Sequence, residues 1–305
     1  MAQPCLPILI AGPTAVGKSE IALSLAERLG GEIISADSMQ VYRGLDLGTA
    51  KPSSADRARV PHHLIDILGL NESFDAAQFV RRAQQTAAEI QARDRVPVFC
   101  GGTGLYFKAY LEGLGEAPPA DAKVRTELEA MPLENLLAEL RERDPAAYEK
   151  IDRKNPRRVI RALEVIHLTG KPFSAQRAGW KSESRIRNPE SRFFCLTRLS
   201  SDLHARINAR VDAMFQRGLV AETRELLQRG LMENKTAMQA ICYRQVVEHL
   251  HGERSLPETI ELVKIRTRQF AKRQLTWFRA QKNLQWIELK PEESPEEILP
   301  RLKLV

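Results

Sequence analysis

The stretch LPILIAGPTAVGKS at residues 6–19 joins a short apolar segment to a loop bounded by glycines. Residues 6–11 predict a buried strand, and the helical spacing of apolar residues over 18–29 predicts a helix. The loop between them fits G-x-x-x-x-G-K-[ST], a pattern whose backbone amides hold phosphate groups at a helix N-terminus. The predicted phosphate site, with Lys18 supplying charge and Ser19 the candidate Mg²⁺ ligand, comprises Gly12, Pro13, Thr14, Ala15, Val16, Gly17, Lys18 and Ser19.

The rest of the first third alternates strand and helix patterns. Strands are predicted at 31–36 and 96–100, and a helix over 75–93 with Asp75 as its cap. Strands separated by helical segments form a parallel sheet through right-handed crossovers. We therefore predict an α/β fold with a P-loop NTPase-like parallel sheet flanked by helices.

The alternation breaks near residues 116–121, and a mainly helical region follows. Helices are predicted at 122–131, 133–143, 145–150 and 156–169, and a polar stretch continues to residue 188. The later elements are a strand at 193–199, helices within 202–229, 237–250 and 257–281, and a last strand at 284–289. The predicted organisation is a core domain at 1–119 and 193–305 with a helical insertion domain at 120–192.

Charge is distributed unevenly along the 305 residues, whose formal net charge is +7. Residues 1–120 carry 11 basic and 13 acidic residues, whereas 121–200 carry 17 and 12. The run at 264–282 holds seven Lys or Arg, no acid and three interleaved aromatic residues. Basic runs are often solvated helix faces, but this one lacks balancing acids, which favours a nucleic-acid partner.

Membrane association and a disulfide framework are not indicated. No apolar run approaches the roughly 18–20 residues that cross a bilayer, so a cytoplasmic protein with no membrane partner is expected. The four cysteines are scattered singly, which is typical of reduced thiols. His62 and His63 lack metal-ligand spacing and are interpreted as structural.

Two further segments follow strands and so are expected at the same sheet edge as the phosphate loop. Asp37 follows the second strand, where a carboxylate could accept a proton or help hold a metal; capping a turn is the alternative role. Thr103 stands in Gly-Gly-Thr-Gly at 101–104, which allows close ligand approach or forms a tight turn. Because the strand at 96–100 ends in Gly rather than an acid, a motor ATPase or GTPase is disfavoured.

Taken together, these motifs resemble the tRNA dimethylallyltransferases of the IPP transferase family, which modify the adenosine 3′ of the anticodon. The resemblance spans nearly the whole chain. The segments that carry it are GPTAVGKS (12–19), ISADSMQVYRGLDLGTAKP (34–52), PHHLID (61–66), GGTGLY (101–106), NPRRVIRALEV (155–165), Gly218-Leu219-Val220 with Glu222 and Arg224, AICYRQ (240–245) and KRQLTWFR (272–279).

The resemblance implies a prenyl transfer from dimethylallyl diphosphate, the ligand of the phosphate loop, to the N6 amine of the adenosine at position 37 of the tRNA. It implies that Lys18 and Arg224 neutralise the leaving diphosphate, with Mg²⁺ near Ser19, and that Asp37 removes the amine proton. Thr103 joins this catalytic set. The target base is expected to leave its stack and enter a channel in the protein.

The resemblance also implies contacts with the tRNA anticodon stem-loop. The residues in this set are Asp37, Ser38, Met39, Gln40, Thr103, Arg125, Arg161, Ala162, Leu163, Glu164, Val165, Cys242, Tyr243, Arg244, Gln245, Val246, Val247, Lys272, Arg273, Gln274, Trp277 and Arg279. Gln40 has an amide suited to reading a base edge. Cys242 departs from the family pattern, which often has glycine at that position.

Two other function classes remain open on the residues alone. A P-loop kinase of a small metabolite or nucleotide would share the phosphate loop and Mg²⁺ but would leave the 264–282 run unexplained. A non-catalytic RNA-binding protein would explain that run but would not need Asp37. The preferred interpretation is a monomeric tRNA prenyltransferase.

Overall fold

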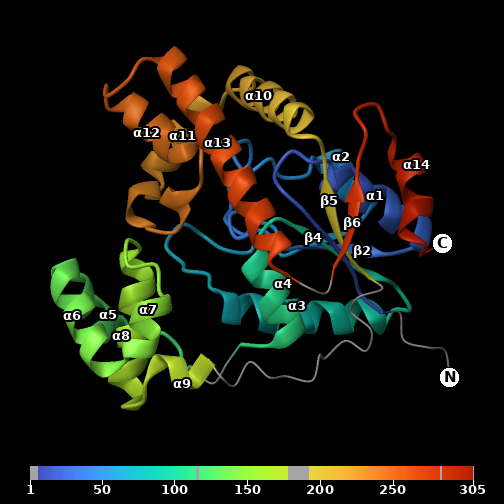
Figure 1. The fold of residues 1–305 in the computed structure, drawn as a ribbon. Coiled ribbons are helices and arrows are strands. Elements are labelled where there is room, and N and C mark those ends of the chain that lie inside the picture. The colour runs from blue at the N-terminus through green and yellow to red at the C-terminus, as the bar shows by residue number, and fades with distance from the viewer. Residues whose placement is uncertain (1–5, 115–116, 178–191, 282–283, 305) are drawn as a thin grey trace. The chain divides into compact units, whose positions relative to one another are not determined.

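The computed structural model describes residues 6–114, 117–177, 192–281 and 284–304 (Figure 1). Their packing divides the chain into two compact units. The described residues of 1–111 and 186–305 form the first unit, and those of 112–185 form the second. None of the described helices is long and apolar enough to cross a bilayer.

The first unit is built on one six-stranded sheet. Its strands are β1 (Ile8–Ala11), β2 (Glu32–Ser35), β3 (His62–His63), β4 (Pro97–Gly101), β5 (Phe193–Thr197) and β6 (Gln285–Glu288). The spatial order is β3-β2-β4-β1-β5-β6, and every pairing is parallel. The predicted fold class is confirmed, and the carboxyl ends of all six strands meet at one edge of the sheet.

Helices cover the sheet, which explains why its central strands are uniformly apolar. Every residue of β1 is fully buried, as expected where a parallel sheet is covered on both faces. The helices of this unit are α1 (Lys18–Leu29), α2 (Ser54–Arg59), α3 (Ala76–Gln91), α4 (Gly104–Glu112), α10 (Ser200–Gln216), α11 (Leu219–Gln228), α12 (Tyr243–Leu250), α13 (Leu256–Arg279) and α14 (Pro295–Ile298).

Several local features refine the predicted elements. The helical stretch at 202–229 contains α10 and α11, which are separated at Gly218, where φ is +99°. The stretch at 237–250 contains α12, which begins only after Cys242. Asp75 caps α3 by accepting a hydrogen bond from the Gln78 amide at 2.8 Å, as predicted.

The second unit is entirely helical in its described part and has its own apolar core. It contains α5 (Ala122–Glu129), α6 (Leu133–Arg143), α7 (Pro145–Lys150), α8 (Pro156–Thr169) and α9 (Phe173–Arg177). Leu128, Leu136, Leu140 and Leu163 are buried together at its centre. Helices α6, α7 and α8 have the predicted bounds, and most of the predicted polar stretch before residue 188 lies outside the described residues.

Candidate active site

The predicted phosphate loop connects β1 to α1 at the carboxyl edge of the sheet. Two arginines, one on α10 and one directly after β5, hold its carbonyl groups: Arg206 Nε donates to Ala15 O at 3.0 Å, and Arg198 Nε donates to Val16 O at 2.9 Å. With two carbonyls held in this way, amides at the start of α1 remain for an anion. Neither arginine was expected from the sequence, because both lie more than 180 residues from the loop.

Lys18 is the first residue of α1, and its Nζ donates to the Pro13 carbonyl at 2.6 Å. Burial, together with the nearby Arg210 guanidinium, lowers the pKa of Lys18 to about 8, against the opposing effects of Cys100 and Asp37. A desolvated ammonium beside a second cation is typical of a site that receives an anion.

Asp37 lies just after β2, and its carboxylate both shapes a turn and lines a cavity. Its Oδ1 accepts hydrogen bonds from the Met39 amide at 2.8 Å and the Gln40 amide at 3.3 Å. Its Oδ2 accepts no hydrogen bond from any described residue. The hydroxyl of Thr103 accepts a bond from the Ser38 amide at 3.2 Å, so the turn is also held from the end of β4. The geometry is therefore compatible with both roles considered for Asp37, capping a turn and accepting a proton or helping to hold a metal.

Gln40 is engaged inside the protein. Its side-chain nitrogen donates to the carbonyls of Thr49 and Ala50 at 3.1 and 3.4 Å, and its oxygen accepts from the Ser35 hydroxyl at 2.9 Å. The amide predicted to read a base edge thus supports the segment that contains Ala50.

Three cavities of the first unit meet around Arg210, Ala50 and Pro52, which line all of them. One, of about 500 Å³, opens on the phosphate loop at Lys18 and Ser19. Another contains Thr14, Asp37, Gln40 and Gln274, and so brings the phosphate loop and the candidate base together.

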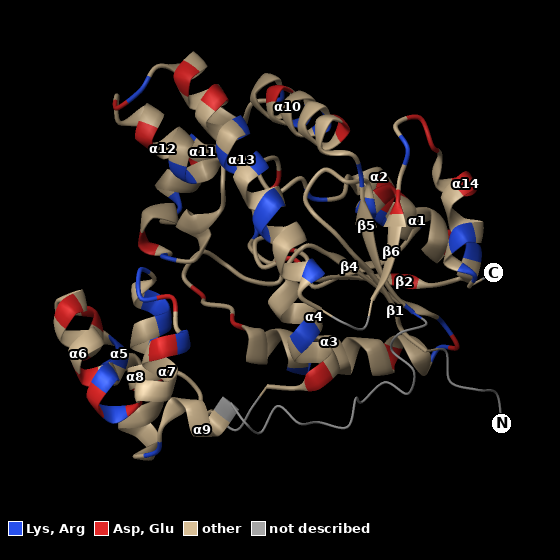
Figure 2. Cartoon of the chain, viewed as in Figure 1, with Lys and Arg blue, Asp and Glu red and all other residues tan. Residues whose placement is uncertain are grey.

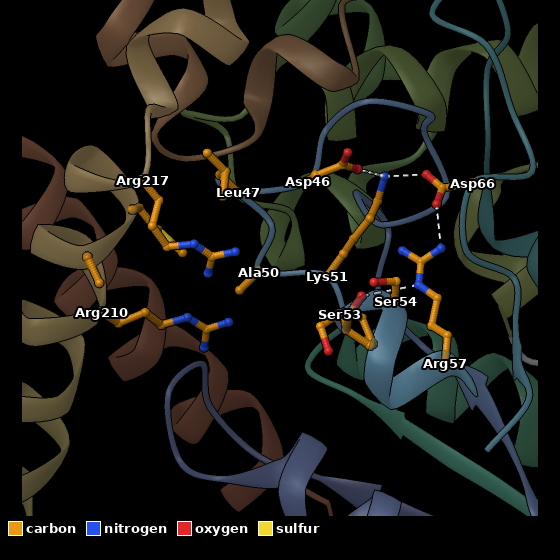
Figure 3. Close-up of a pocket in the computed structure, with 13 residues that line it drawn as sticks. Asp46, Leu47, Ala50, Lys51, Ser53, Ser54, Arg57, Asp66, Arg210 and Arg217 are labelled. Carbon is orange, nitrogen blue, oxygen red and sulfur yellow. Dashed lines mark hydrogen bonds and ion pairs between the residues drawn. The ribbon is translucent and has the colours of Figure 1, made fainter. Parts of the chain in front are cut away.

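The third cavity, about 460 Å³, is drawn in Figure 3. Arg210 and Arg217 extend from one wall toward the segment 46–57, where Lys51 bonds to Asp46 and Asp66. Arg210 forms no hydrogen bond or ion pair with any described residue, and burial lowers its pKa. Arg224, the predicted leaving-group cation, is exposed on α11 and lines none of these cavities.

Helix α13 has an outward cationic face and an inward face that contacts the site. Lys272, Arg273 and Arg279 are exposed, and Figure 2 shows basic residues along the second half of the helix. Gln274 is buried, accepts from the Thr14 amide at 2.9 Å and donates to Gly102 O at 2.9 Å.

The glycines after β4 allow side chains of α13 to pack closely against the backbone. A Cβ on Gly104 would lie 2.2 Å from the ring of Trp277, and one on Gly102 would lie 2.2 Å from the amide nitrogen of Gln274. The sequence suggested that these glycines allow a ligand or a tight turn; the structure fills the space beside them with side chains of the protein itself.

The segment 242–247, which the resemblance implies to face RNA, is buried at five of its six positions. Those five are Cys242, Tyr243, Gln245, Val246 and Val247, whereas Arg244 is exposed. Cys242 has φ of +89°, a conformation that favours glycine, which gives the physical reason for the family pattern. Its amide donates to the Gln245 side chain at 3.0 Å, closing the first turn of α12.

In the second unit, residues 162–165 of the set implied to face RNA are buried. Ala162, Leu163, Glu164 and Val165 have no exposed surface, and Ala162 and Leu163 belong to the apolar core of this unit. Glu164 Oε2 accepts from Arg125 and from Arg161, each at 2.7 Å, and so holds these two partly exposed guanidiniums side by side. Arg125 and Arg161 therefore stay candidates for RNA contact, each with part of its side chain exposed.

No group of three His, Cys, Asp or Glu in the described part of the chain could hold a metal ion. Mg²⁺ rarely needs such a cage, because it usually keeps several waters and binds substrate phosphates with one or two protein ligands. The exposed Ser19 beside the phosphate-loop cavity is compatible with that arrangement.

Comparison with known proteins identifies the family. The IPP transferase model matches residues 40–281. The tRNA dimethylallyltransferase 1 of Trichlorobacter lovleyi is 46% identical over 285 residues, covering 92% of each chain, and the tRNA dimethylallyltransferase of Halorhodospira halophila is 48% identical over 282 residues, covering 90% of each.

Solved structures agree. The tRNA isopentenylpyrophosphate transferase of Bacillus halodurans has 40% identity and a TM-score of 0.72, with 98% of this chain and 95% of that chain covered. A eukaryotic dimethylallyltransferase acting on tRNA has 27% identity and a TM-score of 0.77, with 92% and 73% covered. The resemblance found in the motifs is confirmed: the chain belongs to the IPP transferase family.

Proposed function

We propose that the chain transfers the dimethylallyl group of dimethylallyl diphosphate to the N6 amine of the adenosine at position 37 of tRNA, next to the anticodon. The products are N6-isopentenyladenosine and diphosphate. One observation carries the proposal: a single cavity is lined by Lys18 and Ser19 of the phosphate loop, by Asp37 and by Arg210. Cations for a leaving diphosphate and a base for an amine proton therefore face the same space.

The donor end of the proposal rests on unpaired positive charge. Lys18 and Arg210 would neutralise the diphosphate as the allylic carbon–oxygen bond breaks, which is where charge develops in the transition state. Mg²⁺, held by Ser19 and the phosphate oxygens of the donor, would add to that neutralisation. Arg210 takes the role that the resemblance gave to Arg224, because it faces the cavities and Arg224 does not.

The acceptor end rests on Asp37. As the N6 nitrogen forms its bond to the allylic carbon, the amine proton would pass to Oδ2 of Asp37, while the amides on Oδ1 fix the orientation of the carboxylate. An exocyclic amine is a weak nucleophile, so positioning supplies much of the acceleration.

The tRNA would contact exposed or partly exposed cations on each unit. In the first unit these are Arg244, Lys272, Arg273 and Arg279, and in the second they include Arg125 and Arg161. Cations that track a phosphate backbone are typical of proteins that bind single-stranded loops. We propose that one copy of the chain suffices for this binding.

Incubation with unmodified tRNA and dimethylallyl diphosphate, followed by mass analysis of nucleosides, tests the proposal. A dimethylallyl group on adenosine is the expected product. The variant Asp37→Asn should bind the donor normally and lose turnover, whereas a phosphorylated product with ATP would favour the kinase alternative. RNA binding without any modified nucleoside would contradict the proposal.

A further inference from the structure

The segment 46–51, which we call the donor loop, forms a wall of all three cavities. Ala50 lines each of them, and Leu47, Thr49 and Lys51 each line at least one. The loop contains turns but no helix or strand, and Ala50 has φ of +48°. A segment of this kind keeps its shape only where surrounding groups hold it.

Two residues from a distant part of the chain hold the middle of the donor loop. Both carboxylate oxygens of Glu222, on α11, accept from the Leu47 amide, at 2.9 and 3.1 Å. The hydroxyl of Tyr243, the first residue of α12, accepts from the Gly48 amide at 3.1 Å. The same hydroxyl donates to Glu222 Oε1 at 2.5 Å, so the two side chains act as one unit.

The Glu222–Tyr243 pair is buried at Tyr243 and partly buried at Glu222. Tyr243 is fully buried, and burial raises the pKa of both Tyr243 and Glu222. Its ring also packs on the loop, because a Cβ on Gly48 would lie 2.5 Å from it. The other supports of the loop, Gln40 and Lys51, belong to the same segment of sequence and cannot fix it relative to α10, which carries Arg210.

We propose that Glu222 and Tyr243 are positioning residues for the prenyl donor: they hold the donor loop opposite Arg210 at the distance a diphosphate requires. This inference rests on the proposed function. It moves Tyr243 from the RNA-contacting set implied by the resemblance to the donor side. Its hydroxyl faces the loop, so its loss should weaken diphosphate binding and leave RNA binding unchanged.

The variant Tyr243→Phe tests the inference, because it keeps the ring and removes only the hydroxyl. Removing one partner of buried hydrogen bonds predicts about a tenfold weaker affinity for inorganic diphosphate and a matching rise in the donor KM. Affinity for the anticodon stem-loop should stay within about twofold. Tyr42→Phe is the matched control, since Tyr42 is equally buried but its hydroxyl has no hydrogen-bond partner in the described structure.

Two more variants separate positioning from folding. Gly48→Ala presses a new Cβ against the Tyr243 ring while keeping the side chains of Glu222 and Tyr243, and it should weaken diphosphate binding similarly. Glu222→Gln, which retains an acceptor for Leu47, should restore part of the affinity lost in Glu222→Ala. Reduced stem-loop affinity with an unchanged donor KM in Tyr243→Phe would overturn the inference, as would equal diphosphate affinities for Tyr243→Phe and Tyr42→Phe. Wild-type protein that binds no diphosphate would instead refute the proposed function.

Discussion

The lowered pKa of Lys18 predicts how binding of the diphosphate donor depends on pH. In the free protein its pKa is about 8 against an ordinary value of 10.5, a difference of 2.5 units. A bound diphosphate replaces the lost hydration with negative charge and should return the pKa toward its ordinary value. Since one pKa unit corresponds to about 1.4 kcal/mol, protonated Lys18 contributes up to about 3.5 kcal/mol to binding.

The expected effect is a loss of affinity as the pH rises through 8. At pH 9.5 only about 3% of Lys18 is protonated in the free protein, so the Kd for diphosphate should be about 30-fold weaker than at pH 7. Isothermal titration calorimetry with inorganic diphosphate at fixed Mg²⁺ measures this. Lys18→Arg is the control, because an arginine stays charged throughout and isolates the titration of the ligand itself.

The lysine role would be refuted if wild type and Lys18→Arg lost affinity in parallel between pH 7 and 9.5.

The lowered pKa of Lys18 also predicts that the stability of the free protein rises with pH, whereas its affinity for diphosphate falls. Between pH 8 and 10.5 the unfolded chain binds a proton at this lysine that the folded chain does not, so the free energy of unfolding should rise with pH across that window.

Three further outcomes are expected. Arg210→Ala should weaken diphosphate binding at least tenfold while Arg224→Ala stays near wild type in the same titration; the reverse order would restore the role first predicted for Arg224. Cys242→Gly should be more stable than Cys242→Ala by about 1–2 kcal/mol in urea unfolding, because φ of +89° strains any residue with a Cβ; equal stabilities would contradict that strain. Lys272→Ala should reduce the salt dependence of tRNA affinity by about one unit of log-log slope, and Lys264→Ala should not, because Lys264 is already paired with Asp212 and Glu261; equal slopes would contradict this partition.

The sequence was most informative where local rules decide the outcome. The phosphate loop, the parallel sheet and helices such as α6 and α8 follow from apolar periodicity and from cap residues adjacent in the chain. Short elements were missed, among them α2, which buries none of its residues and so has no apolar stripe, and β3, which has only two residues.

Long-range hydrogen bonds could not be predicted from the sequence. Arg206 bonds to a carbonyl 191 residues away and Gln274 to an amide 260 residues away, so nothing local in the chain signals either contact. Arg210 gave no motif of its own, although it lies four residues after Arg206, one helical turn along α10. The four-residue spacing was the one sequence feature that could have placed Arg210 beside Arg206, because residues i and i+4 share a face of a helix.

Motif membership and ligand contact are different properties, and the buried members of the RNA-facing set show why. Glu164 stands in a motif segment yet has no exposed surface; any effect of it on RNA would pass through Arg125 and Arg161, which it holds together. Tyr243 is likewise a buried residue that acts through another segment, because its hydroxyl bonds to the Gly48 amide of the donor loop and to Glu222. A buried carboxylate that fixes two arginines reduces the conformational entropy those side chains would lose on binding a phosphate. The placement of Arg125 and Arg161 therefore depends on Glu164, and a substitution of this buried acid should alter RNA binding although it does not itself contact RNA.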